Sequence, residues 1–343
     1  MKVRIAMKSV FAKALVHSGQ VEKILFAKSR SQYLILTYHR IVPSREAIAG
    51  LQPGMYVEPN TFQMHMDYLK KYFHVVPFQE IIRLSKSFSD KVDSKPFCVL
   101  TFDDGWFDFY KYAFPILLQE KMYATVFLPT SYINTNKMFW SDIIAYLIVM
   151  IGKNKHDPRR AGTLKSDLAR HIAGLKGPEE SKVENAISLL KKYRKEQIDA
   201  ILDEISDGFD ISFPSTGRAF LNWDEVREMF RSGLIAFGSH TDRHEILVHL
   251  TDDDIKNELN QSKEKLIKEN VVDNTFIPFC FPNGDFNESI VKLVPESGYH
   301  ASVTTESGWN GMNDPMFKLK RISIHQDISS DTQMFGCRLA SII

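Results

Sequence analysis

The sequence predicts an α/β fold built on a parallel sheet and interrupted by a helical insertion. Short apolar runs alternate with segments of helical spacing, which is the pattern of strand, helix, strand units. The alternation stops over about residues 139–218, where the pattern is helical and rich in lysine and arginine, and then resumes. We therefore expect one sheet-based domain over residues 31–343 that carries this helical segment as an insertion.

The expected strands are short runs rich in β-branched and aromatic residues. They cover residues 33–39, 97–102, 124–128, 234–237, 276–281, 301–304 and 319–325. The expected helices place apolar residues at spacings of three and four. They cover residues 62–73, 110–118, 223–230, 252–269 and 289–294. A helix between successive strands allows those strands to pair in parallel.

The composition is that of a globular chain, and it narrows the class of partner. The 343 residues include 43 lysines and arginines and 42 aspartates and glutamates, a formal net charge of +1. A chain so close to neutral has no overall field that attracts nucleic acid, and we expect no nucleic-acid partner. The three cysteines, Cys98, Cys280 and Cys337, form no C-x-x-C pair and are expected to be reduced core residues.

Residues 1–30 are predicted to form an amphipathic helical extension. Lysines interrupt its apolar positions, whereas a secretion signal would show a continuous apolar run. We therefore expect a cytoplasmic protein, and the basic amphipathic helix is compatible with peripheral contact to a membrane. The apolar stretch at residues 143–151 is about half of the roughly 20 residues that a spanning helix needs.

Two short motifs follow predicted strands. Residues 101–105 read Thr-Phe-Asp-Asp-Gly, and residues 240–244 read His-Thr-Asp-Arg-His. Functional side chains of parallel α/β proteins gather where strands end, because the loops converge there. One aspartate and two histidines form a set of metal ligands, and the second aspartate is left as a base. The two motifs together predict metal-assisted hydrolysis.

The aspartate motif has two other interpretations. Asp-Asp-Gly is common as a turn followed by a helix N-cap. Asp103, Asp104 and Asp108 also match the D-D-x-x-x-D spacing of helical diphosphate-binding motifs. Gly105 and the preceding strand disfavour that second interpretation.

The histidine motif also has alternatives. His240 and His244 stand four residues apart, and taken alone they fit one surface and one core histidine. The H-E-x-x-H pattern of zinc proteases is excluded, because Thr241 stands where the glutamate base would be. Their shared placement with the aspartates at strand ends favours the metal site.

These residues resemble the polysaccharide deacetylases of carbohydrate esterase family 4, the NodB-homology domain. Residues 101–105 equal the first motif of that family, and residues 239–244 contain its second motif, H-[ST]-x-x-H. Residues 36–41 resemble the Tyr-His-Arg opening strand of one large branch. The resemblance extends from about residue 33 to the last strand. It implies a distorted (β/α) barrel with about seven parallel strands.

The resemblance also implies roles for individual residues. Asp103 would be the catalytic base, and Asp104, His240 and His244 would bind a divalent metal, with zinc expected first and cobalt, nickel or manganese as alternatives. The metal would make a water acidic, and Asp103 would remove its proton. The backbone N–H after the third-motif proline, here that of Asn283, would help to hold the oxyanion.

The sequence departs from the family in its third and fifth motifs. The third usually reads R-x-x-P-Y and its arginine steadies the base, but residues 279–284 contain no arginine. Arg321 in the last strand, or Arg40 after the first, could replace it. Arg321 and His325 share one face of that strand at a period of two. His325 is the candidate general acid, although it is one position away from the L-x-H spacing, and an exposed strand-end histidine is the alternative.

Two further features have a functional and a structural interpretation. Trp309 stands near the place of the fourth motif and could stack on a sugar face, or it could be a core residue. The basic segment at residues 153–195 could contact an anionic glycan or lipid head group, or it could be a solvated helix face.

The expected function is metal-dependent hydrolysis of an N-acetyl or related acyl amide on an amino sugar of a surface polysaccharide or its precursor. The expected cytoplasmic location favours a nucleotide-linked or lipid-linked precursor as the substrate. One alternative is a metal-binding but catalytically degenerate carbohydrate-binding protein. Another is a formamide or ring-amide hydrolase on the same scaffold.

Overall fold

The computed structural model describes residues 11–29, 31–44, 54–81, 95–153, 158–213, 218–311 and 313–342. The chain clusters into two compact units. The first comprises Met1–Ser44, Tyr56–Thr135 and Phe220–Ile343, and the second comprises Arg45–Met55 and Asn136–Ala219. The helical insertion expected at about residues 139–218 falls within the second unit. The first ten residues of the expected N-terminal extension lie outside the described residues.

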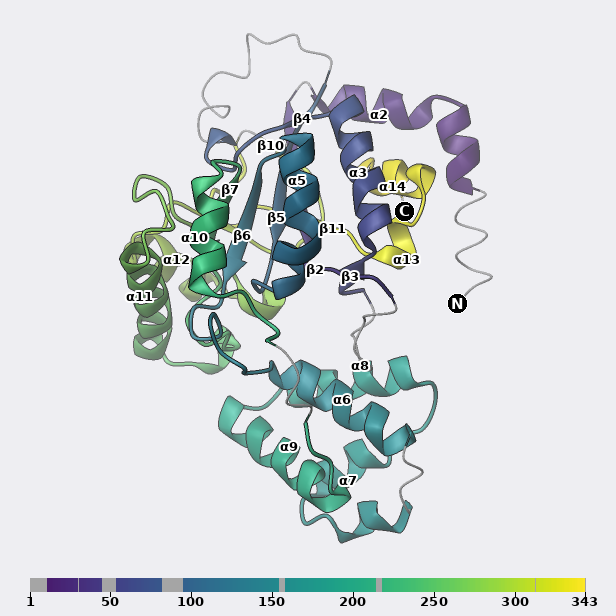
Figure 1. Ribbon diagram of the computed structural model, residues 1–343, viewed down its shortest axis with the longest axis vertical. Coiled ribbons are helices and arrows are strands. Elements are labelled where there is room, and N and C mark those ends of the chain that lie inside the picture. Colours follow the sequence, from purple (N-terminus) through teal and green to yellow (C-terminus); the bar gives the residue numbers. More distant parts are fainter. Residues whose placement is uncertain are drawn as a thin grey trace. The chain divides into compact units, whose positions relative to one another are not determined.

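A curled, mostly parallel sheet forms the centre of the first unit (Figure 1). Among the described residues, the parallel pairings run through β11, β1, β5, β6, β7, β8 and β9. The bounds of these strands are β1 Gln32–Tyr38, β5 Phe97–Phe102, β6 Ala124–Leu128, β7 Ile235–Ser239, β8 Pro278–Cys280, β9 Ala301–Val303 and β11 Ile322–Ser323. The expected strands therefore form, with the last one shorter than predicted.

Short strands extend this sheet at its margins. β10 (Asn310–Gly311) pairs antiparallel with the first residues of β1, and β4 (His74–Val75) pairs in parallel with the first residues of β5. β2 (Arg40–Ile41) and β3 (Tyr56–Val57) form a separate parallel pair directly after β1.

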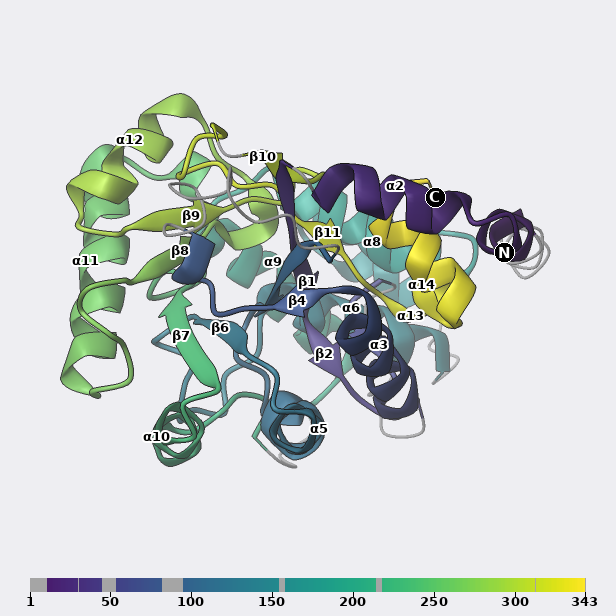
Figure 2. The same ribbon diagram turned by 90° about the horizontal axis from the view of Figure 1, so that it is seen from above.

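The residues before β11 bring the two edges of the sheet together. Leu319 forms a parallel bridge with Val303 of β9, and a few residues later β11 pairs with β1. The sheet therefore curls toward closure, and helices α5, α10, α11 and α12 lie outside its strands (Figure 2). The predicted distorted barrel with about seven strands is confirmed.

Helices connect the strands, and several begin at a side-chain cap. Asn222, Thr251 and Asn287 each accept a hydrogen bond from a backbone N–H in the first turn of the helix that follows. The helices of the first unit include α2 Gln20–Ser29, α3 Pro59–Tyr72, α5 Phe114–Glu120, α10 Trp223–Arg231, α11 Asp252–Lys268, α12 Glu288–Glu296, α13 Gln326–Ser329 and α14 Thr332–Leu339. Shorter turns are η2 Phe109–Ala113, η4 Leu247–His249 and η5 Pro282–Gly284.

Large side chains from several strands fill the inside of the curled sheet. This cluster of buried residues includes Ile35 of β1, Val99 of β5, Phe127 of β6, Cys280 of β8 and Val303 of β9. Side chains of alternate residues point to the same face of a strand, so these positions share the inner face. The interior is therefore packed, and a site can form only at an end of the strands.

The register of neighbouring strands brings several polar residues to one end of the sheet. Thr37 of β1 pairs with Ser323 of β11 on one side and with Thr101 of β5 on the other. His39, His325 and Asp103 each follow two residues later. They therefore lie in one row beyond the carboxyl ends of three adjacent strands.

The second unit is helical. Its helices are α6 Trp140–Lys153, α7 Asp167–Ala173, α8 Glu179–Leu190 and α9 Lys195–Phe209, with a short turn η3 at Pro158–Thr163. α6 packs against α8 and α9 and buries Ile144, Leu147 and Val149. In the described part of the chain, no helix has both the length and the apolar character required to cross a membrane. The cytoplasmic location and the peripheral membrane contact stay predictions.

Candidate metal and acid–base site

The two aspartates at the end of β5 are buried and turn to different partners. Asp104 has a φ of 77° and Gly105 a φ of 65°, so the backbone bends sharply directly after Asp103. A side chain at position 105 would meet Leu128 at 2.7 Å, which is closer than real contacts allow. Asp103 and Asp104 are each 4% exposed. The bend directs Asp104 to two histidines and leaves Asp103 to a buried arginine.

Asp104, His240 and His244 form a compact group that could bind a metal ion. Oδ1 of Asp104 lies 3.4 Å from Nε2 of His240 and 3.4 Å from Nε2 of His244. The three ligand atoms all lie within 4.8 Å of one another. Two imidazole nitrogens and one carboxylate oxygen that converge in this way fit a divalent metal of the zinc type, and three protein ligands leave a position for water or substrate.

Neighbouring groups orient two of these ligands. The Nδ1–H of His240 donates to the backbone oxygen of Cys280 at 2.8 Å, so Nε2 is the nitrogen that can bind a metal once its proton has left. The indole N–H of Trp106 donates to Oδ2 of Asp104 at 3.0 Å and leaves Oδ1 toward the histidines. The ligand atoms are therefore positioned before any metal binds.

The charges in the site favour one protonated and one neutral imidazole in the pair of His240 and His244. Burial lowers the pKa of His240, but the neighbouring carboxylates of Asp104 and Asp103 outweigh burial and raise that pKa well above its usual value of 6.5. Burial lowers the pKa of His244, and its contact with Asp104 only partly offsets this. Burial raises the pKa of Asp104, but hydrogen bonds from the two histidines hold it well below 3.8. The metal-free site is thus a carboxylate beside one imidazolium and one neutral imidazole.

Asp103 forms a two-point ion pair with Arg321. Nη1 and Nη2 of Arg321 lie 2.7 Å from Oδ1 and 2.7 Å from Oδ2 of Asp103. Arg321 is 1% exposed, and its Nε donates to the backbone oxygen of Thr304 at 2.9 Å. Burial raises the pKa of Asp103, but the guanidinium outweighs it and the pKa is lowered. Asp103 is therefore an oriented, ionised carboxylate, as a general base must be.

The other arginine considered from the sequence lies elsewhere. Nε of Arg40 pairs with Oδ2 of Asp108 at 2.7 Å, and the guanidinium packs over the ring of Trp106 at 4.4 Å. Asp108 also accepts a hydrogen bond from the backbone N–H of Ile41. Arg321, rather than Arg40, is thus the arginine that contacts Asp103.

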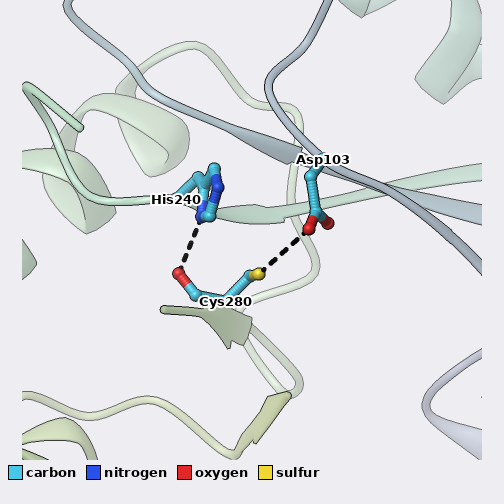
Figure 3. A group of neighbouring side chains, drawn as sticks. All are labelled: Asp103, His240 and Cys280. Atoms are coloured by element: carbon cyan, nitrogen blue, oxygen red, sulfur yellow. Dashed lines mark hydrogen bonds between the residues drawn. The ribbon is translucent and has the colours of Figure 1, made fainter. Parts of the chain in front are cut away.

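Asp103, His240 and Cys280 form a second group of neighbouring side chains (Figure 3). Figure 3 shows the thiol of Cys280 toward Asp103 and its backbone oxygen toward His240, and Sγ lies 3.5 Å from Oδ2 of Asp103. Nη2 of Arg321 lies 3.2 Å from the same sulfur. Because this guanidinium already occupies both oxygens of Asp103, a metal cation is disfavoured here. Burial raises the pKa of the Cys280 thiol, so it is neutral and a weak hydrogen-bond donor.

His39 also lies in the site, although no role in the site was predicted for it from the sequence. Its Nε2 lies 3.9 Å from Oδ2 of Asp103, and its side chain is 21% exposed. From the sequence, His39 served only as part of the Tyr-His-Arg resemblance. The pairing of β1 with β5 places it beside the base, where it can face both the site and solvent.

His325, the predicted general acid, lies on the far side of β1 from Asp103. It is the N-cap residue of α13, and its Nδ1 pairs with Oδ1 of Asp327. Two strand spacings separate its backbone from that of Asp103, roughly 10 Å at about 4.8 Å per spacing. Within the described part of the chain, the ion pair of His325 is with Asp327 and not with either motif aspartate. The geometry therefore favours His39 over His325 as the acid.

Trp309 is not part of the site, and the stacking role predicted for it is wrong. It is 4% exposed, and its indole N–H donates to the backbone oxygen of Leu339 at 2.8 Å. The next residue, Asn310, pairs with Tyr33 at the beginning of β1, whereas the site lies beyond the end of β1. Trp309 is therefore a core residue at the opposite end of the sheet.

Asn283 lies in the turn η5 that follows β8, three residues after Cys280. Its backbone is left-handed, with φ 55° and ψ 0°. Among the described residues, its side-chain Nδ2 is buried without a hydrogen-bond partner. A buried donor without an acceptor is costly, so this position suits a group that a substrate would complete.

The chain is similar in sequence and in fold to known proteins. The chain shares 23% identity over 310 residues with YxkH of Bacillus subtilis (strain 168), a protein named for polysaccharide deacetylation, and the match covers 90% of this chain and 76% of YxkH. The fold is similar to the deacetylase PplD of Streptococcus pyogenes, with a TM-score of 0.54, 20% identity and coverage of 87% of this chain and 94% of PplD. It is also similar to IcaB from Ammonifex degensii, with a TM-score of 0.55, 16% identity and coverage of 89% and 97%.

The polysaccharide deacetylase family model matches residues 90–168 and 176–302, which include both motifs and most strands of the barrel. The Asp-His-His group and the separate carboxylate of Asp103 lie within the matched region. This chain belongs to the polysaccharide deacetylase family.

Proposed function

We propose that this protein removes N-acetyl or related acyl groups from an amino-sugar polysaccharide, or from its precursor, in a metal-dependent hydrolysis. The observation that carries the proposal is that the two adjacent aspartates at the end of β5 have different partners. Asp104 joins two histidines, while the adjacent Asp103 is held apart by Arg321. A ligand set and an independent base are what hydrolysis of an amide needs.

The resident metal in this proposal is zinc, bound by Asp104, His240 and His244. A bound divalent metal would supply a water of lowered pKa and polarise the acyl oxygen. Cobalt, nickel and manganese accept the same ligands and are alternatives for metal reconstitution.

The residues of the chain then have distinct roles. Asp103 accepts the proton of the attacking water, and Arg321 keeps that carboxylate ionised and in place. The water oxygen bonds to the acyl carbon, and the backbone N–H of Asn283 donates to the developing oxyanion. His39 donates a proton to the amine nitrogen as the carbon–nitrogen bond breaks, which releases a carboxylic acid and the free amine.

The test measures acetate release from N-acetylglucosamine oligomers and from nucleotide-linked N-acetylglucosamine. Wild-type protein with added zinc should release acetate, and protein treated with a chelator should not. Release that is insensitive to chelation would contradict the metal-dependent mechanism. Tight glycan binding without release would favour the catalytically degenerate carbohydrate-binding protein, and release of formate or opening of ring amides would favour the other hydrolase.

A further inference from the structure

The segment that carries both metal histidines has a strained backbone. Thr241 has a φ of 63° and His244 a φ of 55°, and neither is glycine. A β-branched residue such as threonine rarely adopts this left-handed conformation, which is costly unless the surroundings enforce it. The separation of His240 and His244 therefore depends on contacts that hold residues 241–243 in place.

One side of this segment is held by the loop after β6. The carboxylate of Asp242 accepts hydrogen bonds from the hydroxyls of Thr130 and Ser131 at 2.7 Å and 2.6 Å. The backbone N–H groups of the same two residues donate to the backbone oxygens of Thr241 and Asp242. These contacts fix the outer edge of the segment.

The other side is held by a buried carboxylate from helix α11. Oε2 of Glu258 accepts hydrogen bonds from the backbone N–H groups of Asp242 at 3.1 Å and Arg243 at 2.8 Å. Oε1 of Glu258 accepts from Nε of Arg243 at 2.6 Å. Glu258 is 1% exposed, whereas the side chain of Arg243 is 53% exposed. A single glutamate thus binds both backbone N–H groups in the middle of the histidine segment.

Helix α11 makes a second contact with the same segment one turn later. Ser262 stands four residues after Glu258, and its hydroxyl lies 2.7 Å from that of Ser239. Ser239 in turn accepts a hydrogen bond from the backbone N–H of Thr241 at 3.1 Å. One face of a rigid helix therefore fixes the residues on both sides of His240.

We propose that Glu258 is a positioning residue for the metal: its two backbone hydrogen bonds hold His240 and His244 in the chelating arrangement and thereby set the metal affinity. The inference rests on the proposed metal site and assigns Glu258 no contact with metal or substrate. A histidine pair that is already arranged loses little conformational freedom when the metal binds. Partners that orient metal ligands typically change metal affinity by about 10–100-fold when they are removed.

The test titrates metal-free protein with Co²⁺ and follows the visible absorption of the bound ion, so that it needs no substrate. Glu258→Ala leaves both backbone N–H groups without an acceptor, and we expect the Co²⁺ dissociation constant to rise about 10–100-fold. Glu258→Gln keeps one carbonyl oxygen for these groups and should restore most of the affinity. Glu264→Gln, an exposed position on the same helix, is the matched control and should bind Co²⁺ as the wild type does.

Two further variants separate the backbone contacts from the ion pair and from folding. Arg243→Met removes the ion pair but keeps both backbone bonds, and it should change the dissociation constant by less than about threefold, because the half-exposed guanidinium is not what holds the backbone of the histidine segment. Glu258→Asp keeps the charge but withdraws the carboxylate by one methylene, so it should weaken Co²⁺ binding even where Glu258→Ala gives no soluble protein. Circular dichroism and urea unfolding establish which variants are folded.

A folded Glu258→Ala or Glu258→Asp variant with wild-type Co²⁺ affinity would overturn the inference. So would a loss of affinity in Arg243→Met equal to that in Glu258→Ala. If the variants weaken Co²⁺ binding but the wild type releases no acetate, the positioning role stands and the proposed deacetylation fails. If the wild type binds no Co²⁺ at all, the metal site itself is refuted.

Discussion

The carboxylate of Asp103 and the guanidinium of Arg321 face each other as a two-point ion pair, with both nitrogen–oxygen distances at 2.7 Å. An ionised carboxylate offers about four lone-pair positions. Arg321 occupies two of them and the thiol of Cys280 points to Oδ2, which leaves about one for the proton that the base must accept. The pair joins the ends of strands that are far apart in the sequence. It therefore couples the position of the base to the closure of the barrel.

Replacing Arg321 by glutamine should destabilise the protein and change its response to acid. Removing one partner of a buried ion pair leaves an uncompensated charge and typically costs about 3–5 kcal/mol. The guanidinium lowers the pKa of Asp103 against the effect of burial, so its loss lets that pKa rise. A base whose pKa rises is protonated at higher pH, and the acid limb of the profile of kcat/KM against pH should move upward. Urea unfolding and acetate release as a function of pH measure the two effects.

A matched control for this variant is Lys318→Gln, which breaks the exposed pair of Lys318 and Glu288. It should change the free energy of unfolding by about 0–1 kcal/mol and leave the pH profile unchanged. An acid limb that stays in place in a folded Arg321→Gln variant would show that the guanidinium does not tune the base.

The adjacent aspartates should give opposite results when each is changed to asparagine. Asp103→Asn removes the base but none of the metal ligands, so bound zinc should stay while acetate release falls by about 10²–10⁴-fold. Asp104→Asn removes the only carboxylate ligand, so zinc should be lost. Metal content by atomic emission and acetate release distinguish the two. Loss of zinc in Asp103→Asn with retention in Asp104→Asn would reverse the assignment.

His39→Gln and His325→Gln should differ in how they respond to the leaving group. An amine leaves only when it is protonated, whereas 4-nitrophenolate leaves without a proton. If His39 is the acid, His39→Gln should lower amide hydrolysis by about 10²–10⁴-fold and spare the hydrolysis of 4-nitrophenyl acetate. His325→Gln should reduce neither. Selective loss of amide hydrolysis in His325→Gln would return the acid role to the histidine predicted from the sequence.

The grouping of Asp104 with His240 and His244, and the separate position of Asp103, were predictable because each residue stands in a short motif whose spacing is decided locally. Arg321 was predictable in a weaker way, from the alternation of side chains in the last strand. The role of His39 was not, because it depends on Thr37 pairing with Thr101, and no local pattern encodes the register between strands. The sequence did contain one indication of this role. His39 follows an apolar strand, as Asp103 does, and residues at strand ends tend to gather at the site.

The roles of Trp309 and Glu258 likewise depend on tertiary contacts that the sequence does not show. Trp309 stands shortly before the last strand, but the antiparallel pairing of β10 places it at the opposite end of β1. Glu258 lies on the buried stripe of α11 between Ile255 and Leu259, where a hydrophobic residue is the usual occupant. A charged residue on such a stripe must have a partner, and only the tertiary structure shows that the partner is the histidine segment.

The three cysteines should be unreactive in the folded protein. Cys98, Cys280 and Cys337 are free and buried, and burial raises the pKa of each thiol. The thiolate is the reactive form, so a thiol with a raised pKa that reagents cannot reach reacts slowly. Titration with a coloured disulfide reagent should show no rapid reaction in native buffer and three thiols in denaturant. Rapid labelling of Cys280 in the native protein would mean that solvent reaches Asp103 from the side on which Cys280 lies.

Metal binding should release about one proton from the protein at pH 7. Burial opposes a charge on His240, but the carboxylates of Asp104 and Asp103 outweigh it, so its pKa lies well above 6.5 and the metal-free imidazole is protonated at neutral pH. The pKa of His244 is lowered, mainly by burial, so that imidazole is already neutral. A metal must therefore displace the proton of His240 alone, and its affinity should fall as the pH falls.

Calorimetric titrations of zinc at pH 7 in two buffers of different ionisation enthalpy give the number of protons released. We expect a value near one, and the release should persist at pH 6, where a metal-bound water with a pKa of about 7 keeps its proton. A value near zero at both pH values would mean that both imidazoles are neutral before the metal arrives. In that case the carboxylates of Asp103 and Asp104 would not keep His240 protonated. The metal would then bind two imidazoles that are already neutral, and no proton would be released.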